Sequence, residues 1–193
     1  MYDYIEGKII EKTPTYMVID TGNVGYFINI SLNTFTRIPD REQCRLFIHQ
    51  IIRDDAHLLF GFIDKQEREI FRQLLTVSGI GANTARLILS SLTPDDIMKA
   101  INEGNVYQLK SVKGIGIKTA QRIIVDLKGK VGKEVEMTEI FMTESNTIRE
   151  ESLSALVHLG FTKSVVDKVI HQIMAEKKDL TVEEVIKEAL KRL

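Results

Sequence analysis

The chain has 193 residues and a mass of 22.0 kDa, and its formal net charge is −1. Hydrophobic residues make up 44% and charged residues 27% of the chain, which excludes intrinsic disorder, collagen and coiled-coil fibres and favours a globular protein. No apolar run approaches the roughly 18 to 20 residues of a membrane span, and acidic residues interrupt the first 20 positions, where a signal peptide would be apolar. We therefore expect a cytoplasmic protein that does not enter a membrane.

The cysteine and histidine content argues against a metal centre. Cys44 is the single cysteine of the chain, so it cannot form an internal disulfide. The four histidines are scattered, and neither a CxxC nor an HExxH spacing occurs. We expect no metal, no cofactor and no catalytic residue.

Charge is distributed unevenly along the chain. Residues 1–62 carry six basic and eight acidic side chains, residues 63–131 carry eleven and seven, and residues 132–193 carry nine and twelve. Only the middle segment has a net positive charge, so only this segment would attract a polyanion such as a nucleic acid.

The first segment, residues 1–62, is predicted to be β structure. Tyr26, Ile28 and Ile30 alternate with other residues as expected for a half-buried strand, and turn residues separate the apolar runs. Five short strands of this kind indicate a small OB-fold barrel, although a small sandwich fits the pattern nearly as well. The expected strands span residues 5–10, 16–20, 25–30, 45–52 and 56–62.

The apolar period becomes helical at Asp64, a predicted helix N-cap with Glu67 three residues later. Helices then continue to about residue 130, so residues 63–131 form a predicted helical domain. Residues 132–146 lose the apolar stripe and accumulate glutamates, which predicts a flexible linker. Residues 147–193 contain three short amphipathic stretches, which predict a three-helix module. The expected fold class is thus multidomain, β plus α.

An internal repeat, at an offset of 35 residues, carries the functional signal. Residues 74–89 match residues 109–124 at eight of sixteen positions, and each copy contains Gly-Ile-Gly and then Thr-Ala. Glycines at these positions allow a positive φ in a tight turn and the close approach of another backbone. Each copy is therefore predicted to be two helices joined by a tight turn, with Ile80 or Ile115 anchored in the core.

The helix after each turn begins with N–H groups that have no intrahelical partner and lie at the positive end of the helix dipole. A phosphate can bind there without any base contact, and Lys113, Lys118 and Arg122 add positive charge around the second turn. A pair of ligand-free helix turns is the alternative, but two copies in the net-positive segment favour nucleic-acid binding. Neither copy has the Walker A ending or follows a strand, so a nucleotide site is disfavoured.

These turns resemble the helix-hairpin-helix motifs of DNA-backbone-binding proteins, and nearly the whole chain resembles the RuvA family of bacterial Holliday-junction-binding subunits. The resemblance rests on residues 53–62 (RDDAHLLFGF), 65–71 (KQEREIF), both hairpins (GIGANTA and GIGIKTA) and 155–161 (ALVHLGF). It implies a non-catalytic homotetramer that holds an open four-way junction during DNA recombination and repair. It also implies two partner proteins, the hexameric RuvB ATPase that drives branch migration and the RuvC resolvase.

The resemblance also implies roles for particular residues. In the family, an acidic pin lies on the turn between the last two barrel strands, where this chain has Asp54 and Asp55. Two adjacent carboxylates repel phosphate and would disfavour DNA other than a junction, although Asp-Asp is also a common hairpin turn. The other expected DNA-binding residues are Gly79, Gly81, Ala82, Asn83, Lys113, Gly114, Gly116, Ile117, Lys118 and Arg122, and the expected motor-binding residues are Leu159, Gly160 and Phe161.

Two positions depart from the family pattern. The first hairpin has Ala82-Asn83, and the second has Ile117, where the family often has a lysine. Backbone amides would then carry more of the contact with DNA, and binding would depend less steeply on salt.

Two other functions compete with a DNA-binding subunit. Tandem helix-hairpin-helix units also occur in nucleases and glycosylases, which need a metal-binding carboxylate cluster or a catalytic Lys or Asp beside the hairpins. No such cluster is visible in the sequence. A protein-interaction scaffold would leave the basic hairpin segment unexplained, so the sequence favours a DNA-binding subunit that is not itself an enzyme.

Overall fold

The structure, a computed structural model, describes residues 2–39, 42–129, 144–177 and 180–193. It divides into two units, residues 1–135 and 136–193, which we call the N-terminal and C-terminal units and describe separately. Among the described helices, none is long and apolar enough to cross a membrane. The described part of the chain also has no group of three or more His, Cys, Asp or Glu side chains placed to hold a metal ion.

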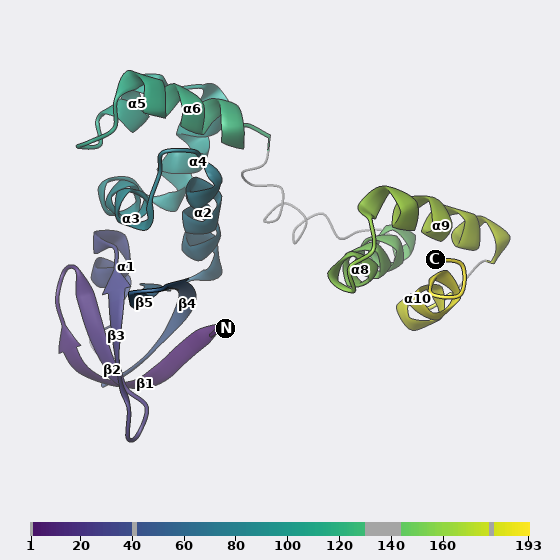
Figure 1. Cartoon of the computed structure of the whole chain (residues 1–193), viewed down its shortest axis with the longest axis horizontal. Helices are drawn as coiled ribbons and strands as arrows, with labels where there is room; N and C mark the ends of the chain where they lie inside the picture. Colours follow the sequence, from purple (N-terminus) through teal and green to yellow (C-terminus); the bar gives the residue numbers. More distant parts are fainter. Residues whose placement is uncertain (1, 40–41, 130–143, 178–179) are drawn as a thin grey trace. The chain divides into compact units, whose positions relative to one another are not determined.

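A closed five-stranded barrel begins the N-terminal unit (Figure 1). Neighbouring strands are antiparallel, except that β3 and β5 pair in parallel. Met17, Ile19, Ile28, Leu46 and Ile48 point inward and are fully buried, as the alternating pattern requires. The predicted OB-type barrel is therefore confirmed, and the sandwich alternative is wrong. In spatial order the strands are β1 (Tyr4–Lys12), β2 (Tyr16–Asp20), β3 (Gly25–Ile30), β5 (Ala56–Phe62) and β4 (Gln43–Arg53).

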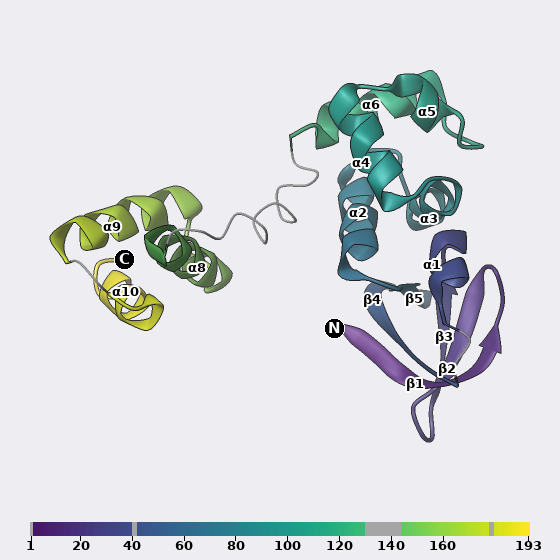
Figure 2. The same ribbon diagram turned by 180° about the vertical axis from the view of Figure 1, so that it is seen from behind.

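A short helix, α1 (Leu32–Arg37), follows β3 and was not expected from the sequence. Ser31 caps it by accepting a hydrogen bond from the Thr34 N–H at 2.9 Å. In both views of the chain α1 lies between the barrel and α3 (Ala82–Ser91) (Figure 1 and Figure 2). This helix therefore connects the barrel to the helices that follow.

The helical part of the N-terminal unit begins where the sequence predicted it. Asp64 caps α2 (Lys65–Thr76) by accepting a hydrogen bond from the Glu67 N–H at 2.8 Å. The helices α5 and α6 lie at the end of the unit away from the barrel (Figure 1 and Figure 2). The helices after α2 are α3, α4 (Pro94–Glu103), α5 (Val106–Lys110) and α6 (Ile117–Leu127).

The last barrel strand and the first helices share a core. Phe60 and Phe62 of β5 pack against Phe71 of α2, with ring centroids 5.1 and 4.9 Å apart, and all three side chains are buried. The same buried cluster continues through the helices to Leu127 at the end of α6. The helices of the first hairpin thus pack on the barrel and α1, and the second hairpin is joined to them through the shared core.

Glu67 does not complete a capping box with Asp64. Its carboxylate does not return to the Asp64 N–H but accepts hydrogen bonds from the hydroxyls of Ser31 and Thr34, the latter at 2.7 Å. The side chain is fully buried, and this burial raises the pKa of the carboxyl, while the two hydroxyls oppose the shift. Glu67 therefore fastens α2 to α1.

The C-terminal unit is a three-helix module with its own core, as predicted. Leu156, Val166, Ile170 and Val185 are fully buried at its centre. Residues 132–143 of the predicted linker lie outside the described residues, and its last three residues already belong to the first helix of the module. The helices are α8 (Glu144–His158), α9 (Lys163–Glu176) and α10 (Val182–Ala189).

Candidate nucleic-acid interface

The sequence repeat corresponds to a repeat in the structure. A tight turn joins α2 to α3, and a second one joins α5 to α6. In the first turn the Ile80 N–H donates to the Val77 carbonyl at 3.0 Å, and Gly79 at the third position has a φ of 89°. In the second turn the Ile115 N–H donates to Val112 at 3.0 Å, and Gly114 has a φ of 88°. This is the geometry of a type II turn, which requires glycine at that position.

The middle residue of each Gly-Ile-Gly holds the turn on the core. Ile80 and Ile115 are buried in the shared cluster of the N-terminal unit, while the glycines on either side are exposed. The predicted anchoring role of these isoleucines is confirmed, so each turn has a fixed position on the surface.

The second glycine of each turn does not adopt the positive φ that the sequence suggested. Gly81 and Gly116 have φ values of −92° and −82° and are the N-cap residues of α3 and α6. A Cβ atom added to either glycine would meet no atom within 4 Å. Neither a backbone angle nor a close packing contact therefore requires glycine at these two positions, whereas a ligand that lies close against the backbone would.

Backbone donors without a hydrogen-bond partner in the described part of the chain follow both glycines. The first helical hydrogen bonds run from Ala85 N–H to Gly81 and from Ala120 N–H to Gly116, both at 2.9 Å. The N–H groups of residues 82–84 and 117–119 make no hydrogen bond within the described part of the chain. Side chains cap the N-termini of α1, α2, α4, α5 and α10, whereas α9 in the C-terminal unit lacks a side-chain cap as α3 and α6 do. The two hairpin helices thus present uncapped, electropositive N-termini.

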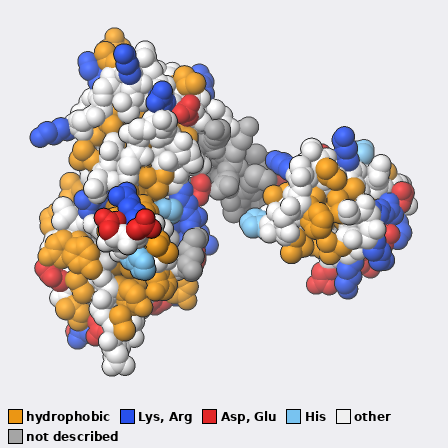
Figure 3. Space-filling view, in the orientation of Figure 1, with side chains coloured by type: hydrophobic (Ala, Val, Ile, Leu, Met, Phe, Trp, Pro, Cys, Tyr) orange, Lys and Arg blue, Asp and Glu red, His pale blue; other side chains and the backbone are white. Residues whose placement is uncertain are grey.

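The two hairpins differ in charge. Figure 3 shows basic side chains at the end of the N-terminal unit that holds α5 and α6. The second hairpin carries exposed cations at three positions where the first carries neutral residues. These cations are Lys113, Lys118 and Arg122, and the residues 35 positions earlier are Ser78, Asn83 and Leu87.

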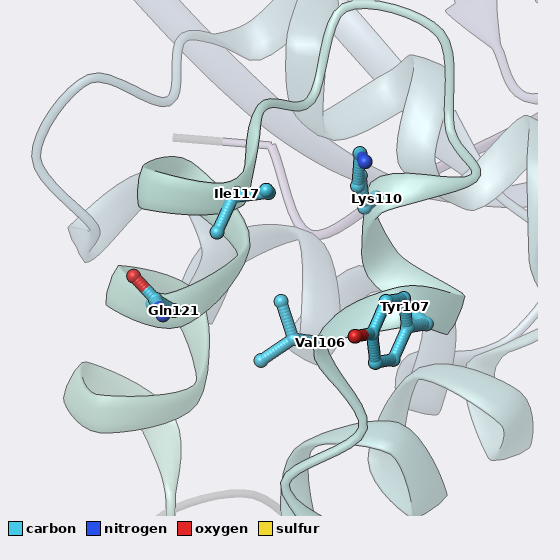
Figure 4. Close-up of a pocket in the computed structure, with 5 residues that line it drawn as sticks. All are labelled: Val106, Tyr107, Lys110, Ile117 and Gln121. Carbon is cyan, nitrogen blue, oxygen red and sulfur yellow. The ribbon is translucent and has the colours of Figure 1, made fainter.

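Ala82 and Ile117 occupy equivalent positions with different surroundings. Ala82 is buried, so it can offer a ligand only its backbone N–H. Ile117 is half exposed and lines a shallow hollow of about 200 Å³ between α5 and α6, beside Tyr107 and Lys110 (Figure 4). The isoleucine therefore contributes apolar surface next to the second turn.

The predicted acidic pin lies on a two-residue turn. Arg53 at the end of β4 and Ala56 at the start of β5 face each other in register, and Asp54 and Asp55 form the turn between them. Both aspartates are exposed, and neither forms an ion pair with any described residue. Two uncompensated negative charges therefore stand at this tip of the barrel.

The expected motor-binding residues have different roles in the C-terminal unit. Leu159 is 62% exposed, so its side chain is available to a partner. Gly160 has a φ of 100° just after α8, and the next N–H, of Phe161, returns to the Leu156 carbonyl at 3.2 Å. Phe161 is partly buried against the core of the unit. The glycine and the phenylalanine thus help to end the helix, and Leu159 is the member of the group that offers free apolar surface.

Arg86 and Asn29 were missed in the sequence. Arg86 lies in α3, one turn after the first hairpin, and its guanidinium contacts Asn29 of the barrel. The repeat gives no signal for it, because the equivalent residue of the second copy is Gln121.

Comparisons with known proteins cover the whole chain. Residues 1–61 match the model of the RuvA N-terminal domain, residues 71–129 the SAM-like helix-hairpin-helix tandem, and residues 147–193 the RuvA C-terminal domain. Three similar proteins carry the name Holliday junction branch migration complex subunit RuvA. Those of Christiangramia forsetii and Flavobacterium psychrophilum are each 50% identical, and that of Bacteroides thetaiotaomicron is 47% identical, with both chains covered completely in every case. The chain belongs to the RuvA family.

Proposed function

We propose that this chain is the non-catalytic DNA-binding subunit that recognises four-way Holliday junctions and recruits the RuvB ATPase for branch migration in recombination and repair. The observation that carries the proposal is the pair of hairpin turns, each with an uncapped helix N-terminus and a glycine that the fold does not require. The similar proteins are named Holliday junction branch migration complex subunits, and this name supports a four-way junction as the DNA that these turns bind.

The hairpins bind the DNA backbone in this proposal. A phosphate approaches Gly81 or Gly116 closely because no side chain stands in its way, and it accepts hydrogen bonds from the unpaired N–H groups that follow. Lys113, Lys118 and Arg122 add ionic contacts at the second turn. Contacts of this kind carry no base information, so the protein reads the shape of the DNA rather than its sequence.

The acidic turn supplies the selectivity. Asp54 and Asp55 repel the phosphates of a continuous duplex, whereas the open centre of a four-way junction leaves room for them between the strands. A junction is then bound by the hairpins without electrostatic repulsion from the aspartates, whereas an ordinary duplex is repelled by them.

We assign the assembly and the domain roles as follows. Residues 1–62 form the barrel with the acidic pin, and residues 63–131 bind DNA. Residues 132–146 are the linker to residues 147–193, which bind the RuvB motor. Residues 147–193 carry eight basic and eight acidic side chains and so have no net attraction for DNA, while Leu159 and Val165 expose apolar surface for a partner. A homotetramer would present one chain to each arm of the junction, with the hexameric RuvB ATPase and the RuvC resolvase as partners in the cytoplasm.

A gel shift that compares a four-way junction with a linear duplex of equal length tests this function. We expect junctions of unrelated arm sequence to bind alike and much more tightly than the duplex. Light scattering with and without the junction gives the number of chains in the complex, and incubation with Mg²⁺ should leave the DNA uncut. Equal affinity for duplex, a strong sequence preference, or cleavage would each contradict the proposal.

A further inference from the structure

Arg86 joins the first hairpin to the barrel. Its side chain extends from α3 to the barrel, where one guanidinium nitrogen, Nη1, donates to the Thr15 carbonyl at 3.0 Å and to Asn29 Oδ1 at 3.1 Å. Thr15 lies in the turn between β1 and β2, and Asn29 lies in β3. A single guanidinium therefore connects the hairpin helix to two separate parts of the barrel.

Asn29 extends this connection toward the acidic turn. Its Nδ2 donates to the Leu59 carbonyl of β5 at 3.1 Å. The strand β5 begins at Ala56, directly after Asp54 and Asp55. A continuous line of hydrogen bonds thus runs from the helix that follows the first phosphate-binding turn to the strand that follows the acidic turn.

The environment of Arg86 is unusual for a charged side chain. It is partly buried, forms no ion pair with a described carboxylate, and is satisfied by neutral oxygens, and burial lowers the pKa of its guanidinium. The equivalent residue in the second repeat, Gln121, is exposed. Partial burial of a cation without a counter-charge is costly, so a gain in stability is a poor explanation for an arginine at this position.

A second arginine links the two hairpins. Arg122 of α6 donates from Nη1 to the carbonyl of Ser78 at 3.3 Å, and Ser78 directly precedes Gly79 of the first turn. Both links use a guanidinium and a backbone carbonyl, but the Arg122 side chain is exposed and so remains available to DNA as well. A substitution of Arg122 would therefore combine a change in hairpin orientation with the loss of a DNA contact, so Arg86 is the better residue with which to test orientation alone.

We propose that Arg86 is a positioning residue for junction selectivity: it sets the orientation of the first hairpin relative to the acidic turn without contacting the DNA. This inference rests on the proposed function. A junction must engage the phosphate-binding turns and accommodate the acidic turn at the same time, so a small change in their relative orientation weakens junction binding. A linear duplex has no opening for the acidic turn and is repelled by it, so a change in this orientation should not weaken duplex binding.

A direct phosphate contact is the competing role for Arg86. The side chain lines an open hollow of about 360 Å³ together with Asn83 and Leu87 on the same helix. The two roles differ in their dependence on salt. The slope of log K against log salt is negative, and removal of a side chain that binds a phosphate reduces the magnitude of this salt slope by about 0.9. Removal of a side chain that only positions the hairpin leaves the salt slope unchanged.

The test measures binding of a four-way junction and of a linear duplex, at several salt concentrations, for the full-length wild type and Arg86→Gln. We expect Arg86→Gln to weaken junction binding about tenfold, with duplex binding within about twofold and the salt slope unchanged. Gln121→Ala, the matched change in the second repeat, should behave as wild type. Equal weakening of both DNAs, or a lower salt slope, overturns the inference, and so does an unchanged ratio of the two affinities. A wild-type protein without junction preference would instead contradict the proposed function.

Asn29→Ala provides a second variant that leaves the arginine in place. It removes one acceptor of Arg86 and should reduce the junction preference in the same direction. Because both changes break the same link, the double variant should be no worse than Arg86→Gln alone. Effects that multiply in the double variant, with all proteins folded by circular dichroism, would show that the two residues act separately and would overturn the inference.

Discussion

Replacing Gly81 and Gly116 by alanine should abolish tight junction binding while leaving the protein folded. Both residues have a negative φ, and the added methyl group meets no atom of the protein. Alanine is a poorer N-cap than glycine by up to about 1 kcal/mol, but it also reduces the entropy of the unfolded chain by about 0.4–1 kcal/mol. The net change in the free energy of unfolding should therefore stay below about 1 kcal/mol for each site.

The effect on binding should be much larger. In the proposed complex the new methyl group would lie between the phosphate and the N–H groups of residues 82–84 or 117–119, and breaking a hydrogen bond to a charged group costs about 1.5–3 kcal/mol. This corresponds to a decrease of about tenfold to a hundredfold in junction affinity for each hairpin. The affinity is measured by fluorescence anisotropy on a labelled junction, and thermal unfolding followed by circular dichroism measures stability.

A glycine that only the fold requires serves as the control. Gly104 ends α4 with a φ of 72°, so Gly104→Ala is strained by about 1–2 kcal/mol but should bind junctions normally. The reasoning fails if the Gly81 and Gly116 variants are folded and bind as wild type, or if they lose as much stability as Gly104→Ala.

Four further changes test other parts of the molecule. Changing Asp54 and Asp55 to asparagine should tighten duplex binding and lower the junction preference in a direct competition assay, because repulsion is removed while the turn is kept; unchanged discrimination would refute a role for the charges. Lys118→Asn, which copies the first hairpin, should lower the salt slope by about 0.9 if the lysine binds one phosphate, and a slope equal to that of wild type would exclude the ionic interaction. The wild type should lose stability as pH rises from the ordinary glutamate pKa to the raised pKa of Glu67, since in this range the folded protein retains a proton that the unfolded chain has released. Glu67→Gln should abolish this loss, and parallel curves of stability against pH for the two proteins would contradict this. Deletion of residues 144–193 should preserve junction binding but abolish stimulation of the ATPase motor, and failure to bind junctions would contradict the division of roles.

The sequence predicted the parts of the candidate interface that depend on local chemistry. The tight turns between the helices were predicted from glycines at fixed spacing, which occur in both copies of the repeat. The same reasoning was wrong about Gly81 and Gly116, because residue type alone does not distinguish a glycine required by a backbone angle from one kept clear for a ligand. The backbone φ in the structure separates these two cases, because a Cβ added at Gly79 or Gly114 would also meet no atom within 4 Å.

Features that depend on contacts distant in sequence could not be predicted. The helix α1 has six residues and is held by hydrogen bonds from Ser31 and Thr34 to Glu67, more than 30 positions away. Arg86 resembles any exposed helix residue in the sequence, and only the folded barrel brings Thr15 and Asn29 within reach of it. Local propensity contains no information about either contact.

The shared aromatic core limits how the chain can be divided. The barrel strands end at Phe62, yet Phe60 and Phe62 are buried in the cluster that continues into the helices, against Phe71. A fragment cut after residue 62 would expose both rings to water and would tend to aggregate. The three-helix module encloses its own core and has no such dependence. Exchange of segments between relatives is therefore expected to succeed beyond residue 129 and to fail at the end of the barrel, even though the sequence pattern changes most sharply there.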